Sequence, residues 1–260
     1  MDLEIDGKTA LVTGASGGIG RETVRRLVEA GVTVTATDLN DDDLAPLRAE
    51  FGVTCIAGDL SSVDGVEALL AETGKSFDIL AHLAGVTGAK GDPLKMAEED
   101  WSDAYSIDFM SAVRLSRHLC PPMIERGWGR VVFVTSENVA QPYPEEAVYN
   151  ASKSALLSFA KSVAMAHSGS GMMVNCIAPA FIETPMTDGM MEKRAKEEGT
   201  SKEDAIESFL AEKRPYLVVG RRGKPEEVAP IIAILCSEHA SFVTGSNWRI
   251  DGGAVGSINV

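Results

Sequence analysis

Residues 8–20 read KTALVTGASGGIG. The apolar run at residues 8–12 suits a buried parallel strand, and glycines follow at positions 14, 18 and 20. Residues 21–30 then have the pattern of an amphipathic helix, which Gly31 closes. A glycine-rich turn between a strand and a helix lets backbone amides approach a pyrophosphate at the helix N-terminus. The order of strand, glycine turn and helix therefore predicts a dinucleotide-binding unit.

A second predicted strand, residues 32–37, ends in Asp38. An acidic residue roughly 20 positions after a glycine turn is placed to accept hydrogen bonds from ribose hydroxyls. The alternative is an ordinary strand-to-helix turn followed by a surface aspartate. Asp38 would repel a 2′-phosphate, and the turn residues Ala15, Ser16 and Gly17 bring no arginine to neutralise one. The sequence therefore predicts NAD rather than NADP as the cofactor.

Tyr149 and Lys153 lie four residues apart in a segment that reads as a helix, residues 149–167. Residues at this spacing share a helix face. A lysine ammonium beside a phenol favours the phenolate, so we expect the pKa of Tyr149 to lie below its usual value of about 10. A tyrosine tuned in this way exchanges protons with an alcohol or a carbonyl. Ser136 follows the apolar run at residues 131–135. The alternative is a packed tyrosine one turn before an exposed lysine.

Together these motifs resemble the classical short-chain dehydrogenase/reductase family, over essentially the whole chain from Gly7 to Gly253. The spacing of the glycine turn matches the cofactor turn of that family. Ser136, Tyr149 and Lys153 match its catalytic serine, tyrosine and lysine. The resemblance implies a Rossmann fold and an oxidoreductase that moves a hydride between a nicotinamide and its substrate.

The resemblance also assigns residues around the two ligands. Those expected to bind the cofactor lie in the glycine turn, after the predicted strands, in the catalytic set and in the segment that closes over the nicotinamide: Gly14, Ser16, Gly17, Gly18, Ile19, Gly20, Asp38, Asp59, Leu60, Ala84, Gly85, Tyr149, Lys153, Pro179, Ile182 and Thr184. Those expected to face the substrate are Ser136, Glu137, Asn138, Tyr143 and Tyr149.

The chain departs from the family pattern at three places. Asp108 stands where the family commonly has an asparagine as the fourth catalytic residue, and an ionised carboxylate accepts hydrogen bonds but donates none. His82 and Leu83 replace two asparagines that brace the sheet in relatives. Ala180 replaces a glycine near the nicotinamide. Asp108 is the one residue that favours a non-catalytic NAD-binding sensor over an enzyme.

Alternation of strand and helix patterns predicts an α/β fold: one domain, residues 1–260, with a doubly wound, mostly parallel Rossmann sheet of about seven strands. The expected strands are the apolar runs at residues 10–13, 33–37, 54–57, 79–83, 131–135, 173–177 and 248–250. Residues 181–222 depart from this alternation and carry two charged helical patterns, at 188–198 and 202–213. This segment resembles the substrate lid of the family. The alternative is a plain helical excursion on the surface.

Composition is consistent with this class. The 260 residues are 45% hydrophobic, enough for one large core, and the net charge of −14 disfavours nucleic acid and anionic membrane as partners. The four cysteines are far apart and form no C-x-x-C motif, so we expect buried thiols, no metal site and a reducing compartment. No leader segment and no apolar run of about 18 residues is present, which predicts a cytoplasmic protein.

The resulting hypothesis is an NAD-dependent oxidoreductase acting on a secondary alcohol or the matching ketone. The polar residues after Ser136 favour a neutral hydroxylated substrate such as a sugar, a polyol or a cyclic alcohol. A 3-oxoacyl or 3-hydroxyacid substrate and the non-catalytic sensor remain alternatives. A nucleotide-sugar epimerase or dehydratase is disfavoured, because the chain lacks the longer substrate domain and the G-x-x-G-x-x-G turn of such relatives. The resemblance also implies a homotetramer.

Overall fold

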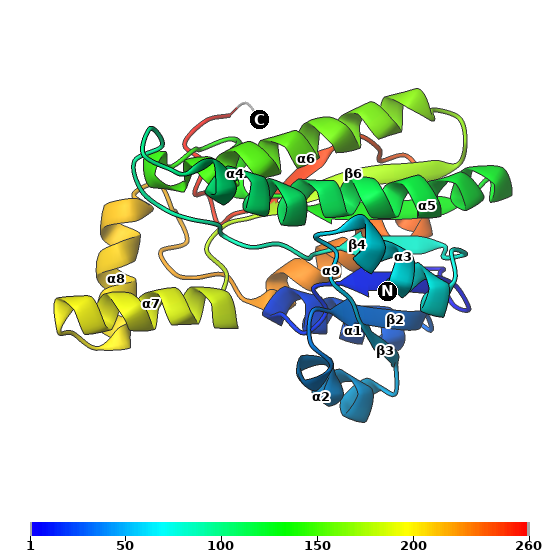
Figure 1. Ribbon diagram of the computed structural model, residues 1–260, viewed down its shortest axis with the longest axis horizontal. Helices are drawn as coiled ribbons and strands as arrows, with labels where there is room; N and C mark the ends of the chain where they lie inside the picture. The colour runs from blue at the N-terminus through cyan, green and yellow to red at the C-terminus, as the bar shows by residue number, and fades with distance from the viewer. Residues whose placement is uncertain (1, 259–260) are drawn as a thin grey trace.

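The computed structural model describes residues 2–258, which form one open sheet with helices on both faces (Figure 1). Within that part of the chain the sheet has seven strands in the order β3-β2-β1-β4-β5-β6-β7, and every neighbouring pair is parallel. The strands are β1 (Thr9–Thr13), β2 (Thr33–Asp38), β3 (Thr54–Ala57), β4 (Ile79–His82), β5 (Gly129–Val134), β6 (Met172–Pro179) and β7 (Asn247–Ile250). The predicted doubly wound α/β sheet is therefore confirmed.

Strand β3 has the predicted bounds, and the boundaries of the other six strands differ from the predicted ones by one or two residues. The largest differences lie in the middle of the sheet, where β5 begins at Gly129 and β6 continues to Pro179. Pro179 remains in the sheet because it pairs with Ile250 of β7, which extends the ladder beyond the apolar run. Pairing with neighbouring strands, which a single segment does not reveal, sets these ends.

Helices cover the two faces of the sheet in separate layers (Figure 1). One face packs against α1 (Gly18–Glu29), α2 (Asp41–Phe51) and α9 (Pro225–Leu235). The other packs against α3 (Val63–Thr73), α5 (Ser111–Arg126) and α6 (Ala147–Ala166), and α4 (Glu98–Tyr105) precedes α5. Each layer buries an apolar cluster against the sheet, with Leu27 and Ile232 in the first and Leu115 and Leu156 in the second. Burial on both faces explains the continuous apolar strand runs.

The strand order reverses between β1 and β4, which are neighbours although β2 and β3 separate them in sequence. Ligands of open α/β sheets bind in the crevice at the carboxyl ends of the strands beside such a reversal. The glycine turn after β1, the loop after β4 and Ser136 after β5 all lie at that edge. The topology therefore brings together the motifs that the sequence separates.

Two helices extend from one end of the sheet, α7 (Pro185–Glu198) and α8 (Lys202–Lys213) (Figure 1). They pack on each other around Phe181, Met191 and Phe209. Side-chain caps begin both helices, because Thr184 accepts a hydrogen bond from Thr187 N–H and Ser201 accepts one from Asp204 N–H. The two helices expected within residues 181–222 are present.

None of the helices in residues 2–258 is long and apolar enough to cross a membrane.

Candidate functional site

The backbone of the glycine turn packs so tightly at Gly14 and Gly20 that no side chain fits at either position. Gly14 has a φ of +62°, and a Cβ on it would lie 2.7 Å from the Ala84 amide nitrogen. A Cβ on Gly20 would overlap the Gly14 carbonyl oxygen. Helix α1 begins at Gly18, inside the turn and earlier than predicted, so its first-turn amides face this cradle. The cradle fits the pyrophosphate of a dinucleotide.

Asp38 is held at the far end of this cradle. Its Oδ2 accepts hydrogen bonds from the Ser16 amide at 3.0 Å and the Ser16 hydroxyl at 2.6 Å, and its Oδ1 accepts one from Leu39 N–H at 2.8 Å. Asp38 and Asp59 line the same cavity of about 350 Å³. The fixed carboxylate of Asp38 can accept hydrogen bonds from ribose hydroxyls, and its negative charge would repel a 2′-phosphate.

Lys153 lies between the cofactor cradle and a buried carboxylate. Its Nζ donates to the Val134 carbonyl at 3.1 Å and lies 4.0 Å from Asp108 Oδ1. The same Nζ lies 5.6 Å from the centroid of the Tyr149 ring. Tyr149 and Lys153 therefore share one side of α6, as their spacing predicts.

The pKa of Tyr149 is raised, chiefly by burial, and further by the carboxylates of Asp108 and Glu137. A hydrogen bond with Ser136 opposes this shift. The expectation that this pKa lies below its usual value is therefore wrong in direction, because burial and the neighbouring carboxylates disfavour the phenolate.

Asp108 lies in a single turn of π-helix, η1 (Ser106–Met110), between α4 and α5. Its side chain is fully buried. Oδ1 accepts from Val86 N–H at 2.7 Å, and Oδ2 accepts from the Ser152 hydroxyl at 3.0 Å. Burial raises the pKa of Asp108, whereas Lys153 and the two hydrogen bonds oppose that shift. This carboxylate therefore fixes the loop after β4 and faces the Lys153 ammonium. Such π-turns are frequent at functional sites.

Ser136 begins the short 3₁₀ turn η2 (Glu137–Val139) directly after β5. Its hydroxyl lies 2.7 Å from Glu137 Oε2 and 3.1 Å from Asn138 Oδ1, and it accepts from Asn138 N–H at 3.2 Å. Glu137 is 3% exposed, and burial raises its pKa to about 7. The serine thus has a titratable carboxyl in direct contact.

A charged cluster that was not predicted surrounds Glu137. Arg214, at the end of α8, places its Nε 3.4 Å from Glu137 Oε1 and its Nη2 3.7 Å from Glu146 Oε2. Lys90, in the loop after β4, donates to Glu146 Oε1 at 2.7 Å. Tyr143, expected to face the substrate, instead lies under the Arg214 guanidinium, 3.5 Å from ring centroid to Cζ. Tyr143 therefore supports Arg214 and does not line the cavity beside Ser136.

His82, the last residue of β4, is a structural residue. Its Nδ1 lies 2.9 Å from the Thr13 hydroxyl, and its Nε2 lies 3.0 Å from the Ser111 hydroxyl. Burial lowers the pKa of His82 to about 3, so the ring is neutral. Thr13 Oγ1 also accepts from the amides of Leu83 and Ala84. This set braces the loop after β4.

Three adjoining cavities connect these parts. The first lies around Asp38 and Asp59, the second beside the glycine turn and Lys153, and the third beside Ser136. Nearly all the sequence-predicted cofactor and substrate residues line them, namely Gly14, Ser16, Gly17, Gly18, Ile19, Gly20, Asp38, Asp59, Leu60, Ala84, Gly85, Ser136, Glu137, Asn138, Tyr149, Lys153, Pro179, Ile182 and Thr184. The third cavity also contains residues that were not predicted, namely Thr87, Lys90, Glu146, Thr187 and Arg214.

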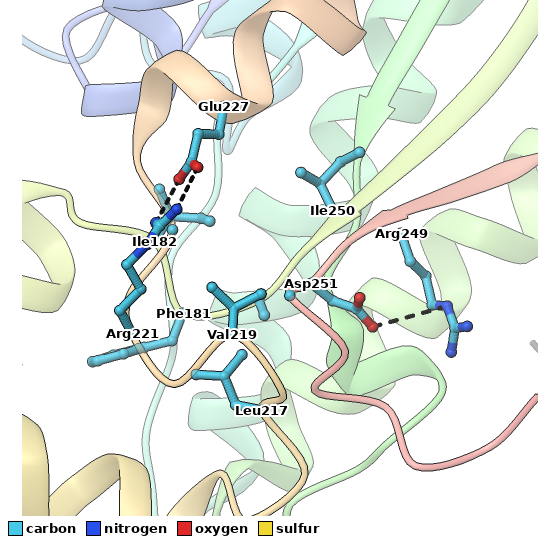
Figure 2. Close-up of a pocket in the computed structure, with 12 residues that line it drawn as sticks. Phe181, Ile182, Leu217, Val219, Arg221, Glu227, Arg249, Ile250 and Asp251 are labelled. Carbon is cyan, nitrogen blue, oxygen red and sulfur yellow. Dashed lines mark hydrogen bonds and ion pairs between the residues drawn. The ribbon is translucent and has the colours of Figure 1, made fainter.

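A fourth cavity, of about 250 Å³, shares the segment Ala180–Ile182 with the third (Figure 2). Leu217, Val219 and Ile250 contribute apolar walls. Its charged groups are paired with each other: Arg221 donates to both oxygens of Glu227, at 2.8 and 2.7 Å, and Arg249 lies 3.9 Å from Asp251 (Figure 2). The only residues that this cavity shares with the three cavities of the site are those of the segment Ala180–Ile182.

Comparison with known proteins agrees with this arrangement. A family profile described as enoyl-(acyl carrier protein) reductase matches residues 14–255. A 3-oxoacyl-[acyl-carrier-protein] reductase of Thermotoga maritima is 32% identical over 264 residues, covering 97% of this chain and 100% of that protein. An uncharacterised oxidoreductase of Bacillus subtilis, YvaG, is 31% identical over 265 residues, covering 99% of this chain and 100% of that protein.

A solved structure extends the likeness to the fold. L-Sorbose reductase from Gluconobacter frateurii, complexed with NADPH and L-sorbose, superposes with a TM-score of 0.90. It is 31% identical to this chain, and the match covers 99% of this chain and 100% of that one. The profile match over residues 14–255, the relatives and this shared fold show that the chain belongs to the short-chain dehydrogenase/reductase family of oxidoreductases.

Proposed function

We propose that this oxidoreductase uses NAD to interconvert a secondary alcohol and its ketone. The observation that carries the proposal is the joint placement of Ser136, Tyr149 and Lys153 around cavities that continue into the glycine cradle. The nicotinamide, when bound, supplies the hydride acceptor or donor. The chain itself must bind the substrate oxygen and move its proton.

Each of the three residues has one task in this proposal. Tyr149 exchanges a proton with the substrate oxygen as general acid or base. Lys153 holds the ribose of the nicotinamide side and supplies a positive charge beside the tyrosine. Ser136 hydrogen-bonds the substrate oxygen where charge develops. Asp108 holds the loop after β4 through Val86 N–H and places its carboxylate 4.0 Å from Lys153 Nζ.

NAD should bind at least about tenfold more tightly than NADP, a difference of about 1.4 kcal/mol. The reason is the fixed Asp38 carboxylate, which accepts from ribose hydroxyls and repels a 2′-phosphate. Fluorescence titration of both cofactors measures the ratio. Asp38→Asn, which removes the charge and keeps an acceptor, should reduce the ratio of NAD affinity to NADP affinity. Binding of NADP by this chain as tightly as NAD would contradict the proposal. NADP is the cofactor to compare because the complex of L-sorbose reductase contains NADPH.

Asp108→Asn should change turnover by less than about tenfold and should shift the pH profile. An asparagine keeps the acceptor for Val86 N–H, so the loop should stay in place. Because the Asp108 carboxylate raises the pKa of Tyr149, its removal should lower that pKa and move the rise of oxidation rate with pH to lower pH. Steady-state rates across pH measure both effects. An inactive wild type with tight NAD binding, activated by Asp108→Asn, would instead indicate a sensor.

We further propose a neutral hydroxylated substrate, such as a sugar, a polyol or a cyclic alcohol. In the cavity beside Ser136, two carboxylates, Glu137 and Glu146, are paired with two cations, Arg214 and Lys90. Because each cation already has an acidic partner, these groups offer donors and acceptors to hydroxyl groups, and while Glu137 is ionised the four carry no net charge that would demand a charged substrate. A substrate screen that follows NADH absorbance tests this, and exclusive turnover of carboxylates would contradict it.

A second candidate substrate is a 3-oxoacyl thioester. The matched family profile and the Thermotoga maritima relative, a 3-oxoacyl-[acyl-carrier-protein] reductase, both favour it. The same screen should therefore contain an acetoacetyl thioester beside ketoses and cyclic ketones. Faster reduction of the thioester than of every hydroxylated ketone would replace the first candidate with the second.

We also propose a cytoplasmic homotetramer, on the basis of the family resemblance. Exposed apolar side chains near the β7 edge support association of copies, among them Val218, Phe242 and the partly exposed Trp248. Sedimentation equilibrium at micromolar protein concentration measures the oligomeric state, and a monomer would contradict the proposal.

A further inference from the structure

The hydroxyl of Ser136 has more acceptors around it than it has hydrogens. Glu137 Oε2 lies 2.7 Å away and Asn138 Oδ1 lies 3.1 Å away. The orientation of the Asn138 amide is fixed, because its Nδ2 donates to Glu146 Oε2 at 2.6 Å and to Asn150 Oδ1 at 2.8 Å. Asn138 Oδ1 is therefore an acceptor only. Of these two neighbours, only Glu137 can carry a proton and become a donor to the serine.

We infer that Glu137 is a positioning residue that sets the direction of the Ser136 hydroxyl, and this inference rests on the proposed alcohol/ketone function. When the carboxyl is protonated, it donates to Ser136 Oγ, and the serine hydrogen is free to point at the substrate oxygen. When the carboxyl is ionised, it takes the serine hydrogen bond, and Oγ presents only acceptor capacity to the substrate. The two states differ by one proton on Glu137 and by the direction of the Ser136 hydroxyl hydrogen.

The two directions of the reaction need opposite states of this switch. In ketone reduction, negative charge develops on the carbonyl oxygen, so a serine that donates stabilises the transition state. In alcohol oxidation, the substrate brings its own hydrogen, so a serine that accepts can hold the hydroxyl in place. Protonated Glu137 therefore favours reduction, and ionised Glu137 favours oxidation.

The surroundings of Glu137 place this switch near neutral pH. Burial disfavours the charged carboxylate most strongly, and the Glu146 carboxylate adds to that effect. Arg214 from α8 and the Ser136 hydroxyl favour the charged form. Tyr149 from α6 also faces this group. The net result is a Glu137 pKa of about 7, so both states are populated in the neutral range.

Among residues 2–258, no second carboxylic acid side chain has an equivalent hydrogen bond with the Ser136 hydroxyl. Glu146 is buried to a similar degree, but it bonds Asn138 and Lys90 and is separated from Ser136 by Asn138. It is therefore a matched control, since Glu146→Gln removes a carboxylate from the same cluster without removing the partner of the serine.

The kinetic test compares kcat/KM for ketone reduction across pH in wild type, Glu137→Gln and Glu146→Gln. In wild type, kcat/KM for reduction should fall by at least about tenfold through pH 7, and by at most the 10²–10³-fold typical for loss of one donor to a developing oxyanion. A glutamine amide donates to Ser136 Oγ at every pH, so Glu137→Gln should abolish this fall and slow oxidation at high pH. Glu146→Gln should keep the fall but move it to lower pH, because the Glu146 carboxylate raises the pKa of Glu137. The inference is overturned if Glu137→Gln keeps the fall of kcat/KM through pH 7, or if both variants lose that fall.

A second readout is independent of turnover. Carbon-13 NMR of protein labelled at the glutamate carboxyl carbon, with Glu137→Gln used for assignment, measures the titration of Glu137 directly. The midpoint should lie near 7 and should rise in Ser136→Ala, because the serine favours the ionised form. A midpoint near the ordinary value of about 4.3 would overturn the inference. If this titration is found but no alcohol or ketone reacts, the proposed function fails and the contact between Glu137 and Ser136 stands.

Discussion

Tyr149→Phe should lower kcat by 10²–10⁴-fold while NAD affinity stays within a few-fold, because loss of a general acid or base typically has this effect. Phenylalanine keeps the ring beside Lys153, whose Nζ lies 5.6 Å from the ring centroid, and removes only the hydroxyl that moves the proton. Steady-state NADH formation gives the rate, and fluorescence titration gives the affinity.

Tyr105→Phe is the matched control for this substitution. Tyr105 is 43% exposed at the end of α4 and packs on Phe109, so loss of its hydroxyl should leave the rate within about twofold. Retention of more than about a tenth of wild-type activity in Tyr149→Phe would show that another group moves the proton.

Lys153→Met should remove nearly all turnover, weaken NAD binding and destabilise the fold. The ammonium lies 4.0 Å from the fully buried Asp108 carboxylate, and methionine keeps the apolar stem while leaving that carboxylate without its cation. Removing one partner of a buried ion pair costs about 3–5 kcal/mol when the remaining charge stays. We expect a loss of about 3 kcal/mol in the free energy of unfolding, measured by urea denaturation.

The double variant Lys153→Met/Asp108→Asn separates these roles. Removal of the uncompensated carboxylate should recover most of the lost stability, whereas turnover and NAD affinity should remain low because the lysine is still missing. Full recovery of turnover in the double variant would show that Lys153 acts only as the partner of Asp108.

Much of the fold follows from short stretches of the sequence. The turn at residues 14–20 works because only glycine fits beside Ala84 and the Gly14 carbonyl, so the requirement is visible in the residues themselves. The apolar strand runs are visible because the sheet is buried on both faces. Tyr149 and Lys153 are four residues apart on one helix, so their neighbourhood is also local.

The surroundings of Ser136 could not be predicted in the same way. Arg214, Lys90 and Glu146 come from α8, the loop after β4 and the turn before α6, and only the folded chain brings them together. Tyr143 was expected in the substrate cavity because it is near Ser136 in sequence, but the Arg214 guanidinium covers its ring. The raised pKa of Tyr149 likewise depends on burial and on acids from other elements.

The most direct test of the proposed reaction follows the hydride itself. NADH deuterated at the transferring position of nicotinamide C4 is incubated with the protein and a panel of ketoses, cyclic ketones and an acetoacetyl thioester, and the products are analysed by mass spectrometry. The proposed function predicts one deuterium on the carbinol carbon of a neutral hydroxylated product, in wild type and not in Tyr149→Phe. Tight NADH binding with no deuterium in any product would contradict it.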